Sequence, residues 1–300
     1  MSPSTASVPP LVTDKSASTA GRIATPPETD KSRTPADVDA LAPPVPPWYT
    51  NTTLQAAVLS VVILVSLLGS WYYAAENSLV SPLILAHPAD VMSALMAQFS
   101  TGAIWPNVWA TVYETIAGFA AATVAALLVA FVFAFFAPLR MAVYPYLVVI
   151  QTFPKVAIAP LIIAAFGYGL MPKIVIAALM AFFPILVNAM VGLSNVSADQ
   201  MNLMRILGAN RWQRLRMLQI PNAVSYILPG LKSAAVLSLI GVIVAEFVSS
   251  REGLGFAIQA STQAGTIDVT YALLIVLSVF GLSISLLLSL LSWCLRNYRQ

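Results

Sequence analysis

Hydrophobic residues gather in long stretches separated by short polar connections, beginning at Leu54. About 20 apolar residues suffice for a helix to cross the hydrocarbon core of a bilayer, and stretches of that length recur along the chain. They are too long and continuous for the strands of a membrane barrel, in which lipid-facing and lumen-facing residues alternate over about ten positions. The pattern therefore predicts an all-α fold with six membrane-spanning helices, at 54–74, 108–137, 141–166, 174–193, 226–248 and 271–295.

The composition supports a polytopic membrane protein and excludes several other classes. Hydrophobic residues make up 59% of the chain and charged residues only 9%, whereas about a quarter of a soluble domain is charged. One cysteine, Cys294, and one histidine, His87, exclude a disulfide framework and a cluster of His or Cys metal ligands. A membrane-bound enzyme would need clustered His, Asp or Cys residues. We therefore expect no catalytic site, no metal site and no nucleic-acid partner.

The N-terminal segment 1–47 has a different composition, with ten of the 21 prolines and many Ser, Thr and Asp residues. Such a segment cannot bury enough apolar surface to offset its chain entropy. A secretory signal is the competing interpretation, but it needs a short apolar core near the N-terminus, and the first apolar run begins only after Trp48 and Asn51. The sequence predicts a disordered, Pro-rich cytoplasmic tail at 1–47 and a transmembrane domain at 48–300.

Lysine and arginine residues are distributed unevenly among the connections, and positively charged loops are retained on the cytoplasmic side. The first connection, 75–107, has none, and the other connections on its side of a six-span chain offer only Lys173 and Arg251. We therefore expect both termini and the fourth connection to be cytoplasmic. The basic residues on that side are Lys15, Arg22, Lys31, Arg33, Arg140, Arg205, Arg211, Arg214, Arg216, Arg296 and Arg299.

The fourth connection has the pattern of two short helices around a glycine. Ser197, with a glutamine three residues later, is a capping-box signature and predicts a helix that runs until Gly208. Asn210 can cap a second helix, which Pro221 is expected to end. This basic and aromatic surface suits a cytoplasmic partner; an amphipathic helix pair lying on the anionic inner leaflet is the alternative. The apolar stripe of the second helix consists of Trp212, Leu215 and Leu218.

Gly208, followed after nine residues by Leu218-Gln219-Ile220-Pro221, resembles the cytoplasmic-loop signature of ATP-binding-cassette importer permeases. The family consensus opens with Glu-Ala-Ala, where this chain has Asn202-Leu203-Met204. The resemblance covers roughly residues 54–295 and leaves the tail unmatched. The segments HPADVMSAL, FPKVAIAPLIIAAFGYG, FFPILVNAMVGL and AEFVSSREGLG are similar to the nitrate, sulfonate and taurine branch of this family.

The resemblance implies a type I importer permease in the bacterial cytoplasmic membrane. Its implied partners are a second copy of the chain, two cytoplasmic ATPase subunits and an extracytoplasmic solute-binding protein. The chain has no phosphate-binding loop ending in Gly-Lys-Ser/Thr, so we expect ATP and Mg on the partner ATPases and no cofactor on this chain. The coupling loop is 197–221, and its candidate ATPase-coupling residues are Asn202, Arg205, Gly208, Ala209, Arg211, Trp212, Arg214, Leu218 and Pro221.

For the solute, the resemblance implies a small anion, such as nitrate, a sulfonate such as taurine, bicarbonate or an aromatic carboxylate. An uncharged heterocycle, such as a pyrimidine or vitamin precursor, is one alternative, and a non-transporting membrane scaffold is another. An ion-coupled carrier would be expected to show an internal repeat and acidic residues at mid-membrane, and neither is evident.

The third span is the candidate for the solute pathway. Pro154 and Pro160 donate no backbone hydrogen bond, so the carbonyls of Ile150 and Val156 lose their usual partners. Broken helices at membrane depth are tolerated beside protein or a water-filled cavity. A simple kink for packing is the alternative. The pathway candidates are Gln151, Thr152, Phe153, Pro154, Lys155, Pro160 and Glu246.

Four ionisable residues lie within or near the spans: Glu114, Lys155, Lys232 and Glu246. A charge at mid-bilayer costs about 3 kcal/mol on insertion scales, so each is a functional candidate. Lys232 can extend its ammonium to the cytoplasmic interface. Lys155 is the nearest to the middle, where it either contacts an anionic solute or forms an ion pair with Glu114 or Glu246.

Small residues recur at every fourth position of the second span, at Gly118, Ala122, Ala126 and Ala130. Such a stripe lets two helices approach closely in lipid, where no hydrophobic force drives them together. The pattern fits either a dimer seam or a contact inside one chain.

Overall fold

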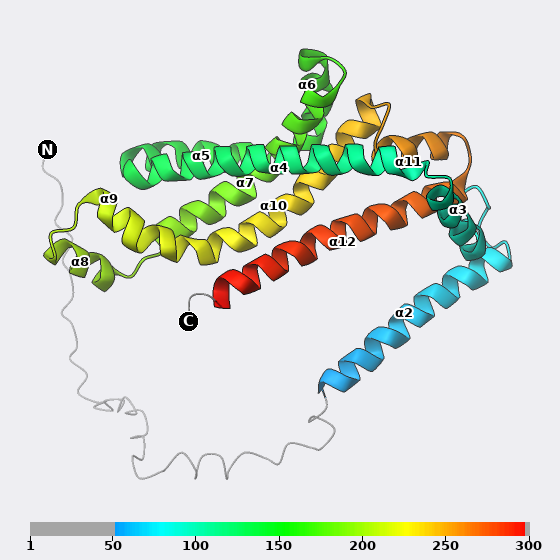
Figure 1. Cartoon of the computed structure of the whole chain (residues 1–300), viewed down its shortest axis with the longest axis horizontal. Coiled ribbons are helices and arrows are strands. Elements are labelled where there is room, and N and C mark those ends of the chain that lie inside the picture. The colour runs from blue at the N-terminus through cyan, green and yellow to red at the C-terminus, as the bar shows by residue number, and fades with distance from the viewer. Residues whose placement is uncertain (1–51, 298–300) are drawn as a thin grey trace, which may run out of the picture. The chain divides into compact units, whose positions relative to one another are not determined.

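The computed structural model describes residues 52–297, so the predicted tail at 1–47 lies outside the described residues. This part of the chain is helical and contains no strand (Figure 1). A 3-10 turn, Lys155–Ile158, and a π-helical segment, Leu215–Gln219, interrupt the α-helices. The α-helices are α2 (Thr52–Glu76), α3 (Pro88–Ser100), α4 (Ile104–Phe135), α5 (Ala137–Thr152), α6 (Ala159–Phe166), α7 (Leu170–Ser194), α8 (Ala198–Ile206), α9 (Arg211–Arg214), α10 (Ile220–Ser249), α11 (Leu254–Gln263) and α12 (Ile267–Asn297).

Five of the described helices are long and apolar enough to cross a membrane: α2, α4, α7, α10 and α12. The remaining predicted span, the third along the chain, is a bent pair, in which α5 and the segment from Lys155 to Phe166 meet at 81°. An α-helix rises 1.5 Å per residue, so about 20 residues cover the hydrocarbon core and each unbroken helix exceeds that length. The prediction of a polytopic, all-α membrane protein with six apolar segments is confirmed.

The core of the fold is formed by α4, α7 and α10, which pack along their lengths. The small-residue stripe of α4 is buried in this core, because Ala122, Ala126 and Ala130 are at most 1% exposed. A Cβ on Gly118 would overlap the Cβ of Ala177 in α7. The stripe is therefore a contact inside one chain, which settles the alternative that the sequence left open.

The third span breaks where the sequence predicts a break. Helix α5 ends at Thr152, Phe153 is extended, and Pro154 precedes the 3-10 turn. The carbonyl of Ile150 accepts from the N–H of Phe153, and that of Val156 from the N–H of Ala159. Each carbonyl that loses its usual donor to a proline therefore accepts instead from the N–H three residues later. Pro160 lies in the first turn of α6 and does not break it, because the first turn of a helix needs no N–H donor there.

Two short helices occupy connections that the sequence pattern left as loops. Helix α3 begins after His87, whose Nδ1 accepts from the N–H of Ala89 at 3.2 Å. The connection before it is held by Trp71, whose indole donates to the carbonyl of Ala86 at 3.1 Å and stacks on Tyr271 of α12. Helix α11 follows α10 after a four-residue turn at 250–253. Both helices lie in connections on the same side of the spans.

Candidate functional site

The connection between α7 and α10 has the predicted helix–glycine–helix form. Ser197 caps α8 by accepting from the N–H of Gln200 at 3.2 Å. Gly208 then turns the chain with φ = 72°, in the left-handed region that glycine tolerates. Asn210 and Gln213 form a reciprocal capping box on α9, with both hydrogen bonds at 2.8 Å. The local hydrogen bonds therefore fix two short helices on either side of Gly208.

The second helix does not end at Pro221, contrary to the prediction. A continuous helical segment runs from Arg211 to Ser249 through the π-helical turn, and Pro221 lies in the first turn of α10. The N–H of Ile220 bonds to the carbonyl of Leu215, five residues earlier. The backbone hydrogen bonds thus change to a spacing of five residues immediately before Pro221. This change lets the helix continue although the proline has no N–H to donate.

The inner side of α9 is fixed to the ends of α4 and α7. Trp212 stacks on Phe135 of α4 with ring centroids 6.0 Å apart and planes within 11°. Leu215 is 2% exposed in the core. Gln219 donates from its amide to the carbonyl of Leu193 in α7 at 3.1 Å. The loop is therefore supported by the transmembrane core.

The outer side of the loop is uncovered and combines apolar with basic side chains. No residue of α8 is buried, and Leu203, Ile206 and Leu207 are 56%, 83% and 70% exposed. Arg205, held by the side-chain oxygen of Asn202 at 3.2 Å, lies in the same helix. Asn202, Arg205, Gly208 and Arg211 of the candidate coupling residues belong to this surface, and Trp212 is also 52% exposed despite its stacking on Phe135. Ala209, Arg214, Leu218 and Pro221 are half-buried.

Basic residues of the connections fall at opposite ends of the core, as their sequence distribution predicts. Arg140, at the start of α5, donates to the hydroxyl of Ser194 at the end of α7, beside the α8–α9 loop. Lys173 and Arg251 lie at the other end, where they line one cavity together. The structure therefore places Arg140 and the Arg-rich loop at the same end of the core.

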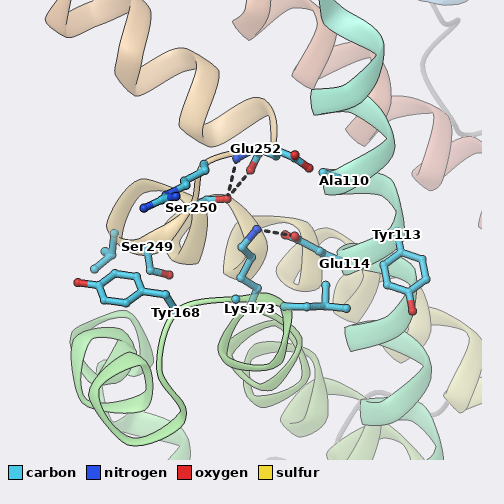
Figure 2. Close-up of a pocket in the computed structure, with 12 residues that line it drawn as sticks. Ala110, Tyr113, Glu114, Tyr168, Lys173, Ser249, Ser250 and Glu252 are labelled. Carbon is cyan, nitrogen blue, oxygen red and sulfur yellow. Dashed lines mark hydrogen bonds and ion pairs between the residues drawn. The ribbon is translucent and has the colours of Figure 1, made fainter.

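At the end of the core away from this loop, a buried ion pair joins α4 to α7. Lys173 donates to Glu114 Oε1 at 2.6 Å, and the two side chains are 8% and 4% exposed (Figure 2). The sequence pattern places Lys173 in a connection and offers an ion pair of Lys155 with Glu114 or Glu246 as one alternative. That alternative is wrong, because no Asp or Glu among residues 52–297 forms an ion pair with Lys155, and the ammonium that reaches Glu114 belongs to Lys173 in the first turn of α7.

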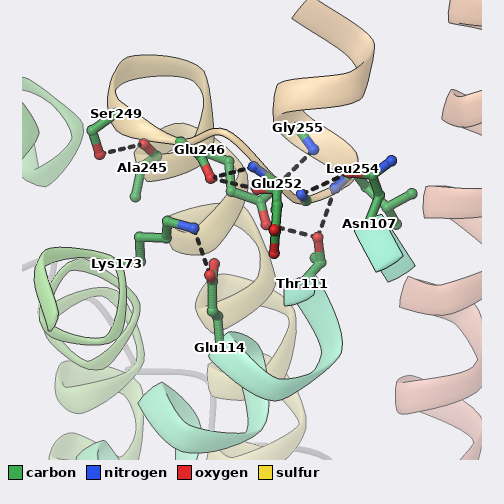
Figure 3. Close-up of polar contacts among 12 residues, drawn as sticks. Asn107, Thr111, Glu114, Lys173, Ala245, Glu246, Ser249, Glu252, Leu254 and Gly255 are labelled. Carbon is green, nitrogen blue, oxygen red and sulfur yellow. Dashed lines mark hydrogen bonds and ion pairs between the residues drawn. The ribbon is translucent and has the colours of Figure 1, made fainter. Parts of the chain in front are cut away.

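Glu246, at the C-terminal end of α10, caps the neighbouring helix α11 (Figure 3). Its carboxylate accepts from the hydroxyl of Thr111 at 2.7 Å and from the N–H of Gly255 at 2.6 Å. Thr111 in turn accepts from the N–H of Leu254 at 2.8 Å. Asn107 completes the cap by accepting from Gly253 at 3.0 Å. Side chains from α4 and α10 therefore satisfy the first donors of α11.

The glycines of this turn leave room for the carboxylate. A Cβ on Gly253 or Gly255 would collide with Glu246, and Gly253 also has φ = 117°. Glu246 is fully buried. The prediction that Glu246 lines the pathway is therefore corrected, since in this structure the side chain is enclosed and anchors a turn.

A cavity of about 820 Å³ lies beside the ion pair, between the N-terminal parts of α4 and α7 and the turn after α10. Ser250 accepts from and donates to the backbone of Glu252 and so shapes that turn. The cavity is amphipathic, with both signs of charge on its walls (Figure 2). Its lining consists of Ala110, Tyr113, Glu114, Tyr168, Gly169, Leu170, Lys173, Val248, Ser249, Ser250, Arg251 and Glu252.

The broken third span presents its polar residues outside the packed core. Gln151, Thr152, Phe153 and Pro154 are exposed. Lys155 donates to the carbonyl of Gln151 at 2.9 Å and lies 4.9 Å from the ring centroid of Phe183. Within the described part of the chain, no Asp or Glu forms an ion pair with Lys155. Among the described residues, a carbonyl and an aromatic face are the contacts that compensate its charge.

These features define a multi-pass helical membrane protein with a structured loop at one end of the core. At the other end is a polar junction, formed by the Glu114–Lys173 ion pair and the Glu246 cap on α11. Residues 118–295 match the family described as the binding-protein-dependent transport system inner membrane component, and the chain belongs to this family. It is thus a non-catalytic permease of an ATP-binding-cassette importer in the bacterial inner membrane, as the resemblance implied. Such permeases work with separate ATPase and solute-binding proteins.

Curated relatives are named for the transport of several different solutes. The chain is 36% identical over 230 residues to the riboflavin transport system permease protein of Chloroflexus aurantiacus, covering 77% of this chain and 86% of the relative. It is 27% identical to the taurine transport system permease protein of Escherichia coli, with the same coverage. It is 37% identical to the formylaminopyrimidine transport permease protein of Halalkalibacterium halodurans, over 47% of this chain and 56% of the relative.

Proposed function

We propose that the chain works as one of two identical permease subunits and receives the ATP-driven conformational change through the α8–Gly208–α9 loop. The observation that supports this most is the two-sided character of the loop. Its inner side is fixed to the core by Trp212 and Leu215, and its outer side exposes Leu203, Ile206 and Leu207. A loop that is packed against the core on one side and exposes apolar side chains on the other can bind a partner and transmit its movement to α4, α7 and α10.

The stacking of Trp212 favours this role over a helix pair that only lies on the inner leaflet. A membrane-surface helix inserts its aromatic residues among lipid headgroups, whereas one face of Trp212, which is 52% exposed, stacks on Phe135 of the same chain. In the proposed complex, a groove of each cytoplasmic ATPase takes the exposed face of α8. ATP and Mg are bound by those ATPases, because the sequence lacks a phosphate-binding loop of its own.

Replacing Gly208 with valine tests the coupling role, and Gly265 provides a matched control. Both glycines have nearly the same positive φ, 72° and 74°, and a Cβ added to either would meet no atom within 4 Å. The backbone strain of a β-branched residue is thus alike at both sites, about 1–2 kcal/mol. Only Gly208 lies in the proposed coupling loop; Gly265 lies between α11 and α12.

In the assembled importer, Gly208→Val should lower both solute uptake and transport-stimulated ATP hydrolysis at least tenfold, while Gly265→Val retains most of both. Membrane insertion should be normal in the two variants. Full ATPase stimulation in the assembled Gly208→Val complex would refute the coupling assignment. An equal loss of uptake and ATP hydrolysis in both variants would mean that backbone strain alone explains the loss, and it would also refute the assignment.

For the solute, the proposal is a small anion that passes the broken third span. Lys155 supports it, because this cation lies beside the helix break with a carbonyl and a ring as its described contacts. A positive charge there offsets part of the cost that an anion has on leaving water. Relatives named for aliphatic sulfonate and nitrate transport agree with an anionic solute, and one named for taurine transport agrees with a solute that carries a sulfonate group.

A planar, uncharged heterocycle is the second candidate. Relatives named for riboflavin and formylaminopyrimidine transport favour it, and the exposed aromatic ring of Phe153, two residues before Lys155, would suit a flat solute. Lys155→Met and Lys155→Arg separate the two candidates. An anion importer should lose uptake with methionine and keep part of it with arginine, whereas a heterocycle importer should transport at a similar rate with methionine.

A further inference from the structure

A groove of about 440 Å³, separate from the cavity beside the Glu114–Lys173 ion pair, lies between the first turns of α5 and the last turns of α7. Its volume falls in the range of ligand pockets, about 300–1,000 Å³. The walls are apolar except at one edge, where Arg140 donates to the hydroxyl of Ser194. The other residues of the groove are Met141, Tyr144, Pro145, Met190 and Val191.

The polarity of the groove changes along the helix axes. Arg140 and Ser194 lie at the ends of their helices, and Tyr144 and Met190 lie four residues further in. Four residues correspond to one turn, about 6 Å deeper in the membrane. A polar rim followed by an apolar wall one turn deeper matches the order of headgroup and acyl chain in a phospholipid.

Among residues 52–297, no carboxylate lies close enough to neutralise the charge of Arg140. A guanidinium carries five N–H donors, and the described contact uses one of its nitrogens for a neutral serine. Within residues 52–297, no Asp or Glu forms an ion pair with Arg140. A half-buried cation at an apolar groove is best compensated by an anion that itself carries an apolar tail.

We propose that this groove binds an anionic phospholipid, with the phosphate at Arg140 and an acyl chain along Tyr144, Met190 and Val191. Basic pockets between membrane helices on the cytoplasmic side are suited to anionic headgroups. The assignment to the inner leaflet follows from the proposed orientation of the permease. Because the groove joins the start of α5 to the end of α7 beside the coupling loop, a lipid there would tie the broken span to the core.

Phosphatidylglycerol binding to the full-length protein in mild detergent, measured by native mass spectrometry, tests the site independently of transport and of orientation. Arg140→Gln should weaken binding roughly tenfold, as expected for a lost charge-assisted hydrogen bond. Arg216→Gln is the control, because it removes an exposed charge at the same end and leaves the groove intact. Val191→Trp should also weaken binding, since it fills the groove and keeps Arg140.

Three results would overturn the proposal. The first is equal phosphatidylglycerol affinity in all variants. The second is full competition by inorganic phosphate, which would make the site a simple anion site. The third is efficient cross-linking of Tyr144→Cys to a second copy with no retained lipid, because the groove would then be a subunit contact. Full ATPase stimulation in the Gly208→Val complex together with normal phosphatidylglycerol binding would refute the proposed function and leave this site standing.

Discussion

Removing Lys173 should destabilise the permease more than removing any other lysine that the structure describes in its spans. Lys173→Met leaves Glu114 buried with its carboxylate 4% exposed and without the ammonium now 2.6 Å from Oε1. The second oxygen, Oε2, already lacks a hydrogen-bond partner. Breaking one side of a buried ion pair costs about 3–5 kcal/mol. For a chain of this size, the melting temperature should fall by on the order of 10 °C.

A double-mutant cycle measures the pair itself. Glu114→Leu combined with Lys173→Met removes both charges and should recover stability to within about 1 kcal/mol of the natural protein, because apolar replacement of a buried pair is often neutral. Because each single substitution should cost about 3–5 kcal/mol and the double only about 1, the coupling energy should be at least about 5 kcal/mol in detergent unfolding experiments. Lys155→Met is the control, with an expected loss of about 1 kcal/mol for its cation–π contact.

Equal losses of melting temperature in Lys173→Met and Lys155→Met would contradict a stabilising ion pair. So would a coupling energy between Glu114 and Lys173 below about 0.5 kcal/mol, the usual limit of additivity for independent sites. Either result would mean that Glu114 and Lys173 are separately solvated and do not hold α4 to α7.

Three further outcomes are expected. Gly253→Ala should unfold at a lower temperature than Gly167→Ala, because both glycines have positive φ but only Gly253 faces the carboxylate that caps α11; equal melting temperatures would contradict the cap. Trp212→Ala should lower transport-stimulated ATP hydrolysis severalfold by loosening α9 from Phe135, and unchanged hydrolysis would exclude that stacking from coupling. Deleting residues 1–45 should leave uptake intact in a transport assay, since it removes no span; lost uptake with normal topology and assembly would give the tail a binding role.

The long apolar segments could be predicted from the sequence because the bilayer imposes their length. The break at Pro154 could be predicted too, since a missing N–H donor is a property of the residue itself. Helices α3 and α11 could not, because segments of 13 and 10 residues are too short and too mixed in polarity to stand out from a loop. The coupling loop was predictable in its caps but not at Pro221, where a π-helical turn accommodates the proline.

The polar junction shows which information the sequence lacks. Hydropathy ranks Glu114, Lys155 and Glu246 by depth along a helix but not by the direction of the side chain around it. Lys173 was assigned to a connection, yet α7 begins three residues earlier and turns its ammonium into the core. Glu246 was assigned to the pathway, yet the turn at Gly253 encloses it. The spacing of Glu246 from the two glycines was the available signal, and only the structure explains it.

Photo-cross-linking at Ile206 tests the central claim, that the α8–Gly208–α9 loop is the contact for the ATPase. Ile206 is 83% exposed on α8, and Tyr168, 85% exposed at the opposite end of the core, is the matched control. A photoreactive residue at Ile206 in the full importer should form an adduct with the ATPase subunit that decreases on Gly208→Val substitution, and one at Tyr168 should form none. An adduct with the ATPase from Tyr168, or only lipid adducts from Ile206, would contradict the account.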